Sequence, residues 1–305
     1  MSFQRVVTRV LPDGSTRKVY PFHVSLEGME SVLLCRDEED FRTLENYFFI
    51  SAWENNCLII IHVVMSNHGH LSVLATDYES ACRLGETIKQ RVSMYLQSKY
   101  REQKRLSRTT VNVQLLDNEW YVRNALAYIV KNVADTGMRL EDYRWCGYDA
   151  MFVQGKCPGA VRAVRSLTRR EKEAIFHSHA DLSRVPWLLD RKDRLVHASA
   201  CDWRYLEEAF GGDQTFFLKA IGTVNDAQMQ EKLVNAPRRR QNDAEFIVTV
   251  TDIAGRWFQK PVYELTLEQK TRIVPYLFRC FHTTPSQLAR CVQLERDAVI
   301  RILNP

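Results

Sequence analysis

The sequence lacks several features that would fix its class at once. No two of its eight cysteines form a C-x-x-C pair, so the simplest interpretation is reduced thiols in a cytoplasm and no cysteine-based zinc site. No apolar run approaches the ~20 residues of a membrane span, and the N-terminal MSFQRVVTRV contains no signal-peptide core. We therefore expect a cytoplasmic protein with no membrane partner. The net charge of +5 allows a nucleic-acid partner without requiring one.

The 305 residues are enough for two or three domains. Apolar periodicity predicts a strand, a helix, two strands, a helix and a further strand, at 19–26, 37–52, 57–64, 68–74, 81–100 and 111–116. This order favours an α+β fold, in which an antiparallel sheet carries helices on one face. We place a first domain at residues 1–154, a helical accessory region at 155–234, and a linker with a C-terminal helical domain at 235–305.

The stretch from Cys57 to Leu74 reads CLIIIHVVMSNHGHLSVL, two apolar runs that flank a short polar turn. Alternate side chains of a strand share one face, so His68 and His70 project together and only Gly69 lies between them on the other face. Two neighbouring imidazoles on a strand form half of a metal site. The alternative is that this pair is only the polar face of a strand.

A second informative stretch is the predicted helix at 118–135, with Asp117 as its cap and Gly137 at its end. One arc of this helix is apolar and forms its core face, whereas another arc carries tyrosines and asparagines with few long charged residues. The members of this second arc are Tyr121, Asn124, Tyr128, Asn132 and Asp135. Tyr128 and Asn132 are four residues apart and therefore neighbours on the helix surface. Half-buried tyrosines at a helix boundary are the alternative explanation.

The two stretches together suggest phosphoryl-transfer chemistry. A tyrosine hydroxyl with a pKa of ~10 is a poor nucleophile at neutral pH, and a divalent metal ion helps by polarising a phosphate oxygen. In this hypothesis Tyr128 attacks phosphorus and forms a covalent phosphotyrosine, which conserves the bond energy for a later rejoining step. The ion is held by His68, His70 and Asn132.

Alternatives remain open within this hypothesis. Gln114 or Asp135 could replace Asn132 as the oxygen ligand, and Tyr121 is the next candidate nucleophile. Imidazole ligands would also suit Mn, Ni or Zn.

Residues 20–150 resemble the single-tyrosine HUH transposases, the IS200-like group, and in particular the branch associated with repetitive extragenic palindromes. The resemblance is carried by MSNHGHL at 65–71, YIVKNV at 128–133 and DYRWCGY at 142–148. The family pattern there reads roughly M-P-N-H-x-H-L, Y-I-x-x-N-P-V and D-Y-x-W-S-S-Y.

This resemblance implies a ferredoxin-like core, a divalent ion (Mg or Mn), and cleavage of single-stranded DNA near hairpin ends through a 5′-phosphotyrosine, the chemistry of DNA transposition and recombination. By matched position it implies that His68 and His70 are metal ligands, with Asn132 as the third. It also implies that Tyr128 is the nucleophile. Related transposases occur as monomers and dimers, so a homodimer is a further expectation, as is association with a bacterial nucleoid.

The sequence departs from the family pattern in four places. Ser66 replaces the usual Pro, which loosens the turn before the histidines, and Val133 replaces the Pro after the asparagine. Gly69 stands where the family has a bulky apolar residue, so we expect the strand to lose a core anchor. Residues 101–116 lack the glycine and aromatic residues expected before the catalytic helix. These departures motivate an alternative function, a domesticated non-catalytic protein that binds DNA sequence-specifically.

A basic segment at 99–108, KYREQKRLSR, either continues a solvated helix end or forms an edge that contacts DNA phosphates. The residues predicted to contact DNA there are Lys99, Arg101, Lys104, Arg105 and Arg108. Residues 235–243, NAPRRRQND, are predicted to be an exposed linker.

The C-terminal residues PSQLARCVQLERDAVIRIL have the spacing of a helix-turn-helix that follows a helix at 267–281. Thr284 is the predicted cap with Pro285 in the first turn, and Gln293 stands where such turns often have Gly. The predicted core positions are Leu288, Leu294, Val299 and Ile302. The second helix would enter the major groove of double-stranded DNA with Arg296 and Arg301 exposed. Helical hairpins of this spacing also occur as plain packing units.

A third hypothesis is a two-histidine phosphoesterase, which needs two H-x-S/T motifs on a ferredoxin-like core. The motifs at 70–72, 197–199 and 282–284 match formally, although such matches arise readily by chance. We favour DNA cleavage, and therefore expect substitution of His197 to be silent.

Overall fold

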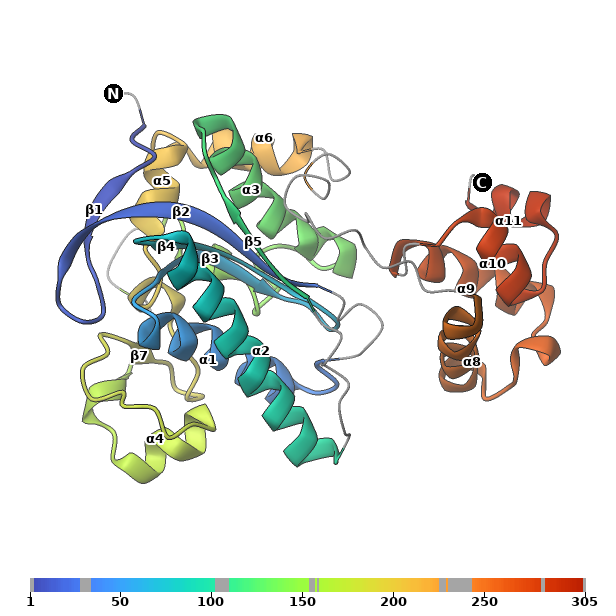
Figure 1. The fold of residues 1–305 in the computed structure, drawn as a ribbon, viewed down its shortest axis with the longest axis horizontal. Helices are drawn as coiled ribbons and strands as arrows, with labels where there is room; N and C mark the ends of the chain where they lie inside the picture. The colour runs from blue at the N-terminus through green and yellow to red at the C-terminus, as the bar shows by residue number, and fades with distance from the viewer. Residues whose placement is uncertain are drawn as a thin grey trace. The chain divides into compact units, whose positions relative to one another are not determined.

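The computed structural model describes residues 3–27, 34–101, 110–153, 157, 159–224, 229, 243–280 and 283–303. These residues form a mixed α/β fold with a curled antiparallel sheet and a helical C-terminal part (Figure 1). The chain divides into two compact units, Met1–Asn235 and Ala236–Pro305. None of the described helices is long and apolar enough to cross a membrane.

The sheet is built around β4 (Gly69–Ala75), which lies between β2 (Thr16–Glu27) and β3 (Leu58–Val64). β5 (Thr110–Leu115) pairs with the other edge of β2, and every pairing is antiparallel. The predicted strands are confirmed to within a few residues. β1 (Val7–Val10), which pairs with the start of β2, was not predicted.

Helices cover both faces of this sheet. α1 (Glu38–Glu54) and α2 (Tyr78–Tyr100) pack on one face, while α3 (Glu119–Lys131), α5 (Trp203–Ala209) and α6 (Gln214–Thr223) pack on the other. The expectation of helices on one face only is therefore wrong. Helices are needed on both faces because β3 and β4 are buried along almost their whole length, and a strand that is apolar on both faces must be covered on both.

Short polar residues begin the helices as expected, with one correction. The Asp37 carboxylate accepts a hydrogen bond from the Asp40 amide at 2.9 Å and caps α1. At α3 the cap is Asn118, not Asp117, because the Asn118 side chain accepts from the Tyr121 amide at 2.8 Å. After Lys131 the chain continues as a 3₁₀ helix, Asn132–Thr136. This helix ends at Gly137, which has φ +73°.

A bulge in β3 decides which way its side chains point. Ile59 and Ile61 face the consecutive residues Val73 and Ser72 of β4, so Ile60 is an extra residue. Ile59 packs toward α1 and α2, whereas Ile60 and Ile61 both pack toward α3. Beyond the bulge, His62 returns to the α1 face.

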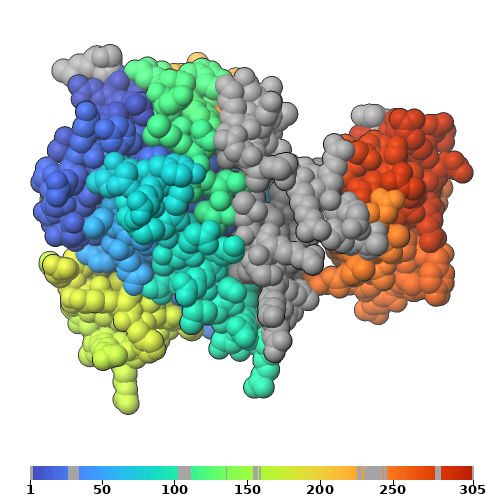
Figure 2. All heavy atoms as spheres, in the orientation of Figure 1, coloured from blue at the N-terminus to red at the C-terminus, as the bar shows by residue number. Residues whose placement is uncertain are grey.

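The accessory region belongs to the same unit as the sheet. It contains α4 (Arg169–Phe176), which packs against α1, and two short paired strands, β6 (Arg162–Ala163) and β7 (Leu188–Leu189). The atoms around α4 and β7 lie against those of α1 and α2 in Figure 2. Short 3₁₀ helices complete the unit at Gly147–Ala150, Val164–Ser166 and His197–Ser199.

The C-terminal unit has its own core. It consists of α8 (Asp243–Phe258), a 3₁₀ turn at Val262–Glu264, α9 (Leu267–Cys280), α10 (Pro285–Val292) and α11 (Arg296–Leu303). Leu288 and Val299 are fully buried, with Leu294 and Ile302 packed against them. Thr284 caps α10 as predicted, and Gln293 adopts the left-handed conformation with φ +57°. α8 was not predicted, and most of the expected linker at 235–243 lies outside the described residues.

Candidate active site and a buried histidine–glutamate group

The histidine pair lies at the start of β4, on the side of the sheet that faces α3. The rings of His68 and His70 are 5.0 Å apart between centroids. Their neighbour Gly69 points to the opposite face, toward α1. His70 is buried and His68 is half-buried, so the pair reaches from the core to the surface.

The structure brings the predicted tyrosine and asparagine to this pair. The Tyr128 ring on α3 packs against the His70 ring, with centroids 5.5 Å apart. Asn132 follows α3, and its Oδ1 lies 3.3 Å from Nε2 of His68. The Asn132 Nδ2 donates to the Tyr128 carbonyl at 2.8 Å, which directs the amide oxygen toward the histidine.

The hydrogen bonds of His68 restrict its protonation. Its Nδ1 lies 2.9 Å from Oδ1 of Asn67, and its Nε2 faces the Asn132 oxygen. A neutral imidazole has one N–H and can donate to only one of these two oxygens. The second nitrogen then presents a lone pair to an oxygen, unless the ring is doubly protonated or a cation lies between them.

A third imidazole borders the pair. His23 on β2 stacks on His70 with centroids 5.2 Å apart, and burial lowers its pKa to about 3, so the ring is neutral. Neither of its ring nitrogens has a hydrogen-bond partner among the described residues. Gln114 on β5 pairs with His23, so β2 separates it from the histidine strand. The side chain of Asp135 lies outside what the structure describes.

Gly69 does not weaken the core, which corrects the expectation of a lost anchor. A Cβ atom at this position would lie 2.6 Å from Cζ of Phe48, a fully buried ring on α1. The aromatic side chain therefore occupies the space that a bulky residue on the strand would take.

The predicted DNA-contacting residues have different surroundings. Lys99 bridges three carboxylates of the α1 N-terminus at 2.7–2.9 Å, those of Asp37, Glu39 and Asp40. Arg101 is exposed at the end of α2, while Lys104, Arg105 and Arg108 lie outside the described residues. In the C-terminal unit, Arg296 and Arg301 are both exposed on α11.

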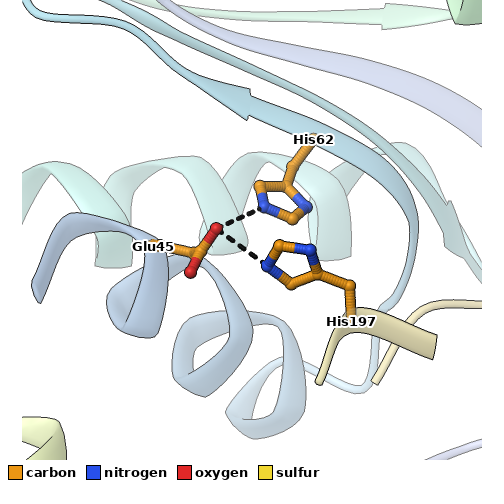
Figure 3. Close-up of side chains that lie close together, drawn as sticks. All are labelled: Glu45, His62 and His197. Atoms are coloured by element: carbon orange, nitrogen blue, oxygen red, sulfur yellow. Dashed lines mark hydrogen bonds and ion pairs between the residues drawn. The ribbon is translucent and has the colours of Figure 1, made fainter. Parts of the chain in front are cut away.

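A second group of metal-ligating side chains lies on the α1 face of the sheet. Glu45 on α1 meets His62 on β3 and His197 on a 3₁₀ turn (Figure 3). Oε1 of Glu45 is 2.9 Å from Nε2 of each histidine. All three side chains are almost completely buried, and together they could hold a metal ion.

In the absence of an ion, the charges of this group support one another. Burial would raise the pKa of Glu45, but the His197 charge and hydrogen bonds from both histidines lower it to about 2. Burial would lower the pKa of His197, but the charges of Asp149 and Glu45 raise it to about 10. The pKa of His62 is lowered, mainly by burial.

Sequence reasoning missed this group. A signal was present at one of the three residues, since His62 interrupts a stretch that is otherwise apolar, and a buried polar residue needs a partner. The partner itself could not be read from the sequence, because the β3 bulge sets the direction of His62 and His197 is distant along the chain.

The phosphoesterase hypothesis conflicts with this geometry. His70 faces α3, whereas His197 lies on the α1 face, so the sheet separates them. His282 lies outside the described residues. Because His197 is buried and bonded to two carboxylates, its substitution should destabilise the fold, while the absence of an effect on DNA cleavage itself stays a prediction.

Comparison with known proteins adds no relative. No protein-family model, curated protein or solved structure matches this chain. Any assignment of function therefore depends on the residues and their geometry.

Proposed function

We propose that this protein cleaves single-stranded DNA and transfers the cut strand, as a metal-dependent transposase-like enzyme that uses Tyr128 as its nucleophile. The observation that carries the proposal is the meeting of His68 and His70, at the start of β4, with Tyr128 on α3 and Asn132 directly after it. These are the residue types that a tyrosine-dependent phosphoryl transfer needs, at one place, from segments about 60 residues apart.

The arrangement of the sheet supports the same proposal. The strand order β5–β2–β4–β3, with α1 and α2 packed on one face, is the order of a ferredoxin-like core. In this interpretation α3 is added to the open face and carries the nucleophile to the central strand.

His68, His70 and Asn132 would hold a divalent ion, which we propose to be Mg²⁺ or Mn²⁺. Two imidazoles and an amide oxygen suit Mn²⁺ better than Mg²⁺. The two oxygens that flank the His68 ring fit this assignment, since in the tautomer that donates from Nδ1 to Asn67 the Nε2 lone pair is directed to the side of Asn132. When bound, such an ion polarises a phosphate oxygen.

The chain's own residues perform the remaining steps. The Tyr128 oxygen attacks phosphorus, the bond to the 3′ oxygen breaks, and a 5′-phosphotyrosine forms. The phenolic proton passes to solvent, and the released 3′ oxygen takes up a proton. Attack by another 3′ hydroxyl reverses the step and rejoins the strand.

The proposed partners are DNA of two kinds. Single-stranded DNA with hairpin ends would reach the Tyr128 site. Double-stranded DNA would bind the C-terminal unit, where α10 and α11 follow one another across a short turn at Gln293, the spacing of a helix-turn-helix, and α11 exposes Arg296 and Arg301. A homodimer is part of the proposal.

A covalent-adduct assay tests the chemistry. The full chain is incubated with Mn²⁺ or Mg²⁺ and single-stranded oligonucleotides from the DNA that flanks its gene, and a protein–DNA adduct is sought on a denaturing gel. We expect an adduct with wild type and with the matched control Tyr121→Phe, and none with Tyr128→Phe or His68→Ala. An adduct that survives Tyr128→Phe would refute the assigned nucleophile.

A second candidate function is non-catalytic DNA binding. The observation that favours it is burial of the nucleophile, since Tyr128 is only 5% exposed. Tight metal-independent binding of the same oligonucleotides without any adduct would support this function over the first.

A further inference from the structure

We propose that Glu45, His62 and His197 form a structural centre for a borderline first-row transition-metal ion such as Zn²⁺, separate from the histidine pair on β4. Asp149 would orient His197 from outside the ligand set. This inference does not depend on the proposed DNA chemistry.

The ligand atoms converge from three parts of the fold. Glu45 comes from α1, His62 from the bulged strand β3, and His197 from the accessory region. Their ligand atoms all lie within 4.8 Å of one another, and both imidazoles direct Nε2 at the same carboxylate oxygen (Figure 3). Three lone pairs can therefore meet at one point.

The donor set fits a zinc-like ion. Two imidazole nitrogens and one carboxylate oxygen are typical ligands of Zn²⁺ and its neighbours, and a poor set for Mg²⁺ or Ca²⁺. Around a tetrahedral zinc ion with bonds of 2.0–2.2 Å, ligand atoms are about 3.3 Å apart. To match, the 2.9 Å separations from Glu45 to each histidine lengthen slightly, and the histidine ligand nitrogens, which lie within 4.8 Å of each other, come to the same spacing. A water or the second Glu45 oxygen would fill the fourth position.

Asp149 is placed as an outer partner of a metal-bound histidine. Its Oδ1 lies 2.5 Å from Nδ1 of His197, the nitrogen that faces away from Glu45. A carboxylate at that position fixes the ring and makes the other nitrogen a better ligand. It also balances the charge, because a divalent ion bound by Glu45 and two neutral imidazoles retains one positive charge.

The surroundings are closed, which indicates a structural role. Phe49 packs on both imidazoles, with centroids 5.1 Å from His62 and 6.1 Å from His197. At Gly147 a Cβ atom would lie 3.1 Å from Nδ1 of His62, so the backbone runs close over that ring. Closed sites of this kind stabilise the fold, and here the ion would tie the accessory region to α1 and β3.

The test measures metal binding directly. The His68→Ala/His70→Ala double variant of the full chain serves as the reference, because it removes the proposed DNA-cleavage ligands. After dialysis against a chelator, the reference is titrated with Zn²⁺, and with Co²⁺ to record the visible absorption of a four-coordinate ion. We expect one equivalent to bind and the melting temperature to rise.

Asp149→Asn, added to the reference, is the decisive variant, since the Asp149 side chain is 56% exposed and its loss leaves the core packed. We expect a 10–100-fold weaker metal affinity, while Asp142→Asn, an exposed neighbour, binds as the reference does. Glu45→Gln should abolish binding. If the reference binds no Zn²⁺, or if Asp149→Asn and Asp142→Asn bind equally, the group is only a hydrogen-bonded ion pair. The DNA-adduct assay is unaffected by either result.

Discussion

Substitution of Gly69 tests how the histidine strand is packed. A Cβ atom at this position would lie 2.6 Å from Cζ of Phe48 and 3.5 Å from the Val63 carbonyl. The Phe48 ring is fully buried, so it cannot move into solvent. We therefore expect Gly69→Ala to destabilise the N-terminal unit by about 1–3 kcal/mol, the usual cost of overpacking a core.

The same reasoning predicts a strong coupling between the two positions. Phe48→Ala alone should cost about 3–5 kcal/mol because it leaves a cavity. In that background the new methyl group at position 69 meets no ring, so Gly69→Ala should cost little or nothing. The double variant should therefore be more stable than the sum of the single effects by at least about 1 kcal/mol.

Urea unfolding followed by tryptophan fluorescence measures these differences, because Trp257 is the single tryptophan of the C-terminal unit and the other five report on the N-terminal unit. Gly222→Ala is the matched control. Its Cβ atom would meet nothing within 4 Å on α6, so it should stabilise by about 0.4–1 kcal/mol. Additive effects of Gly69→Ala and Phe48→Ala would refute the claim that the ring fills the strand's missing side chain.

Three further predictions follow from single contacts. Burial would raise the pKa of Asp40, but hydrogen bonds from Lys99 and Tyr100 hold it below its ordinary value of 3.8. The ionised carboxylate therefore stabilises the fold above about pH 4, and this stabilisation is lost as the pH falls through the lowered pKa. The difference in unfolding free energy between wild type and Asp40→Asn should thus be constant from pH 5 to 7 and shrink below pH 4; a difference that does not change with pH would contradict this assignment. Gln293→Gly should stabilise the C-terminal unit by about 0.5–1 kcal/mol in a Trp257-monitored melt, because φ +57° favours glycine. Arg301→Ala should lower the salt dependence of double-stranded DNA binding by about one unit of slope in a fluorescence titration, with Asp297→Ala as a control that does not.

The order of strands and helices was readable because each element is marked by local chemistry. Alternating apolar residues define β2 and β4, and Asp37 and Thr284 mark helix starts by accepting a backbone hydrogen bond. The neighbourhood of the candidate active site was readable for the same reason. One rule, alternation along a strand, places His68 beside His70, and another, the helical turn, places Tyr128 beside Asn132.

What could not be read depends on non-local packing. α8 begins inside the segment 235–243, whose basic and polar composition favours a linker, and it packs against α10. Part of the cover on the second sheet face comes from α5 and α6, far along the chain from β3. The space above Gly69 is filled by Phe48, whose direction depends on how α1 lies on the sheet. Local sequence patterns do not predict such contacts, because the contacting segments are far apart along the chain.

The bulge at Ile60 shows how a local irregularity of one strand changes which distant residues its side chains contact. In a regular strand, residues 59, 61 and 63 would share one face and His62 would lie with Ile60 on the other, toward α3. The extra residue reverses this order from Ile61 onward, so His62 points to α1, while Ile61 and Val63 move to the face of His70. The hairpin of β3 and β4 therefore carries two separate clusters of histidines, one on each face. The two clusters differ in access to solvent. The cluster of His70 reaches the surface through the half-buried His68, whereas the ring of Phe49 packs on both histidines of the other cluster, His62 and His197.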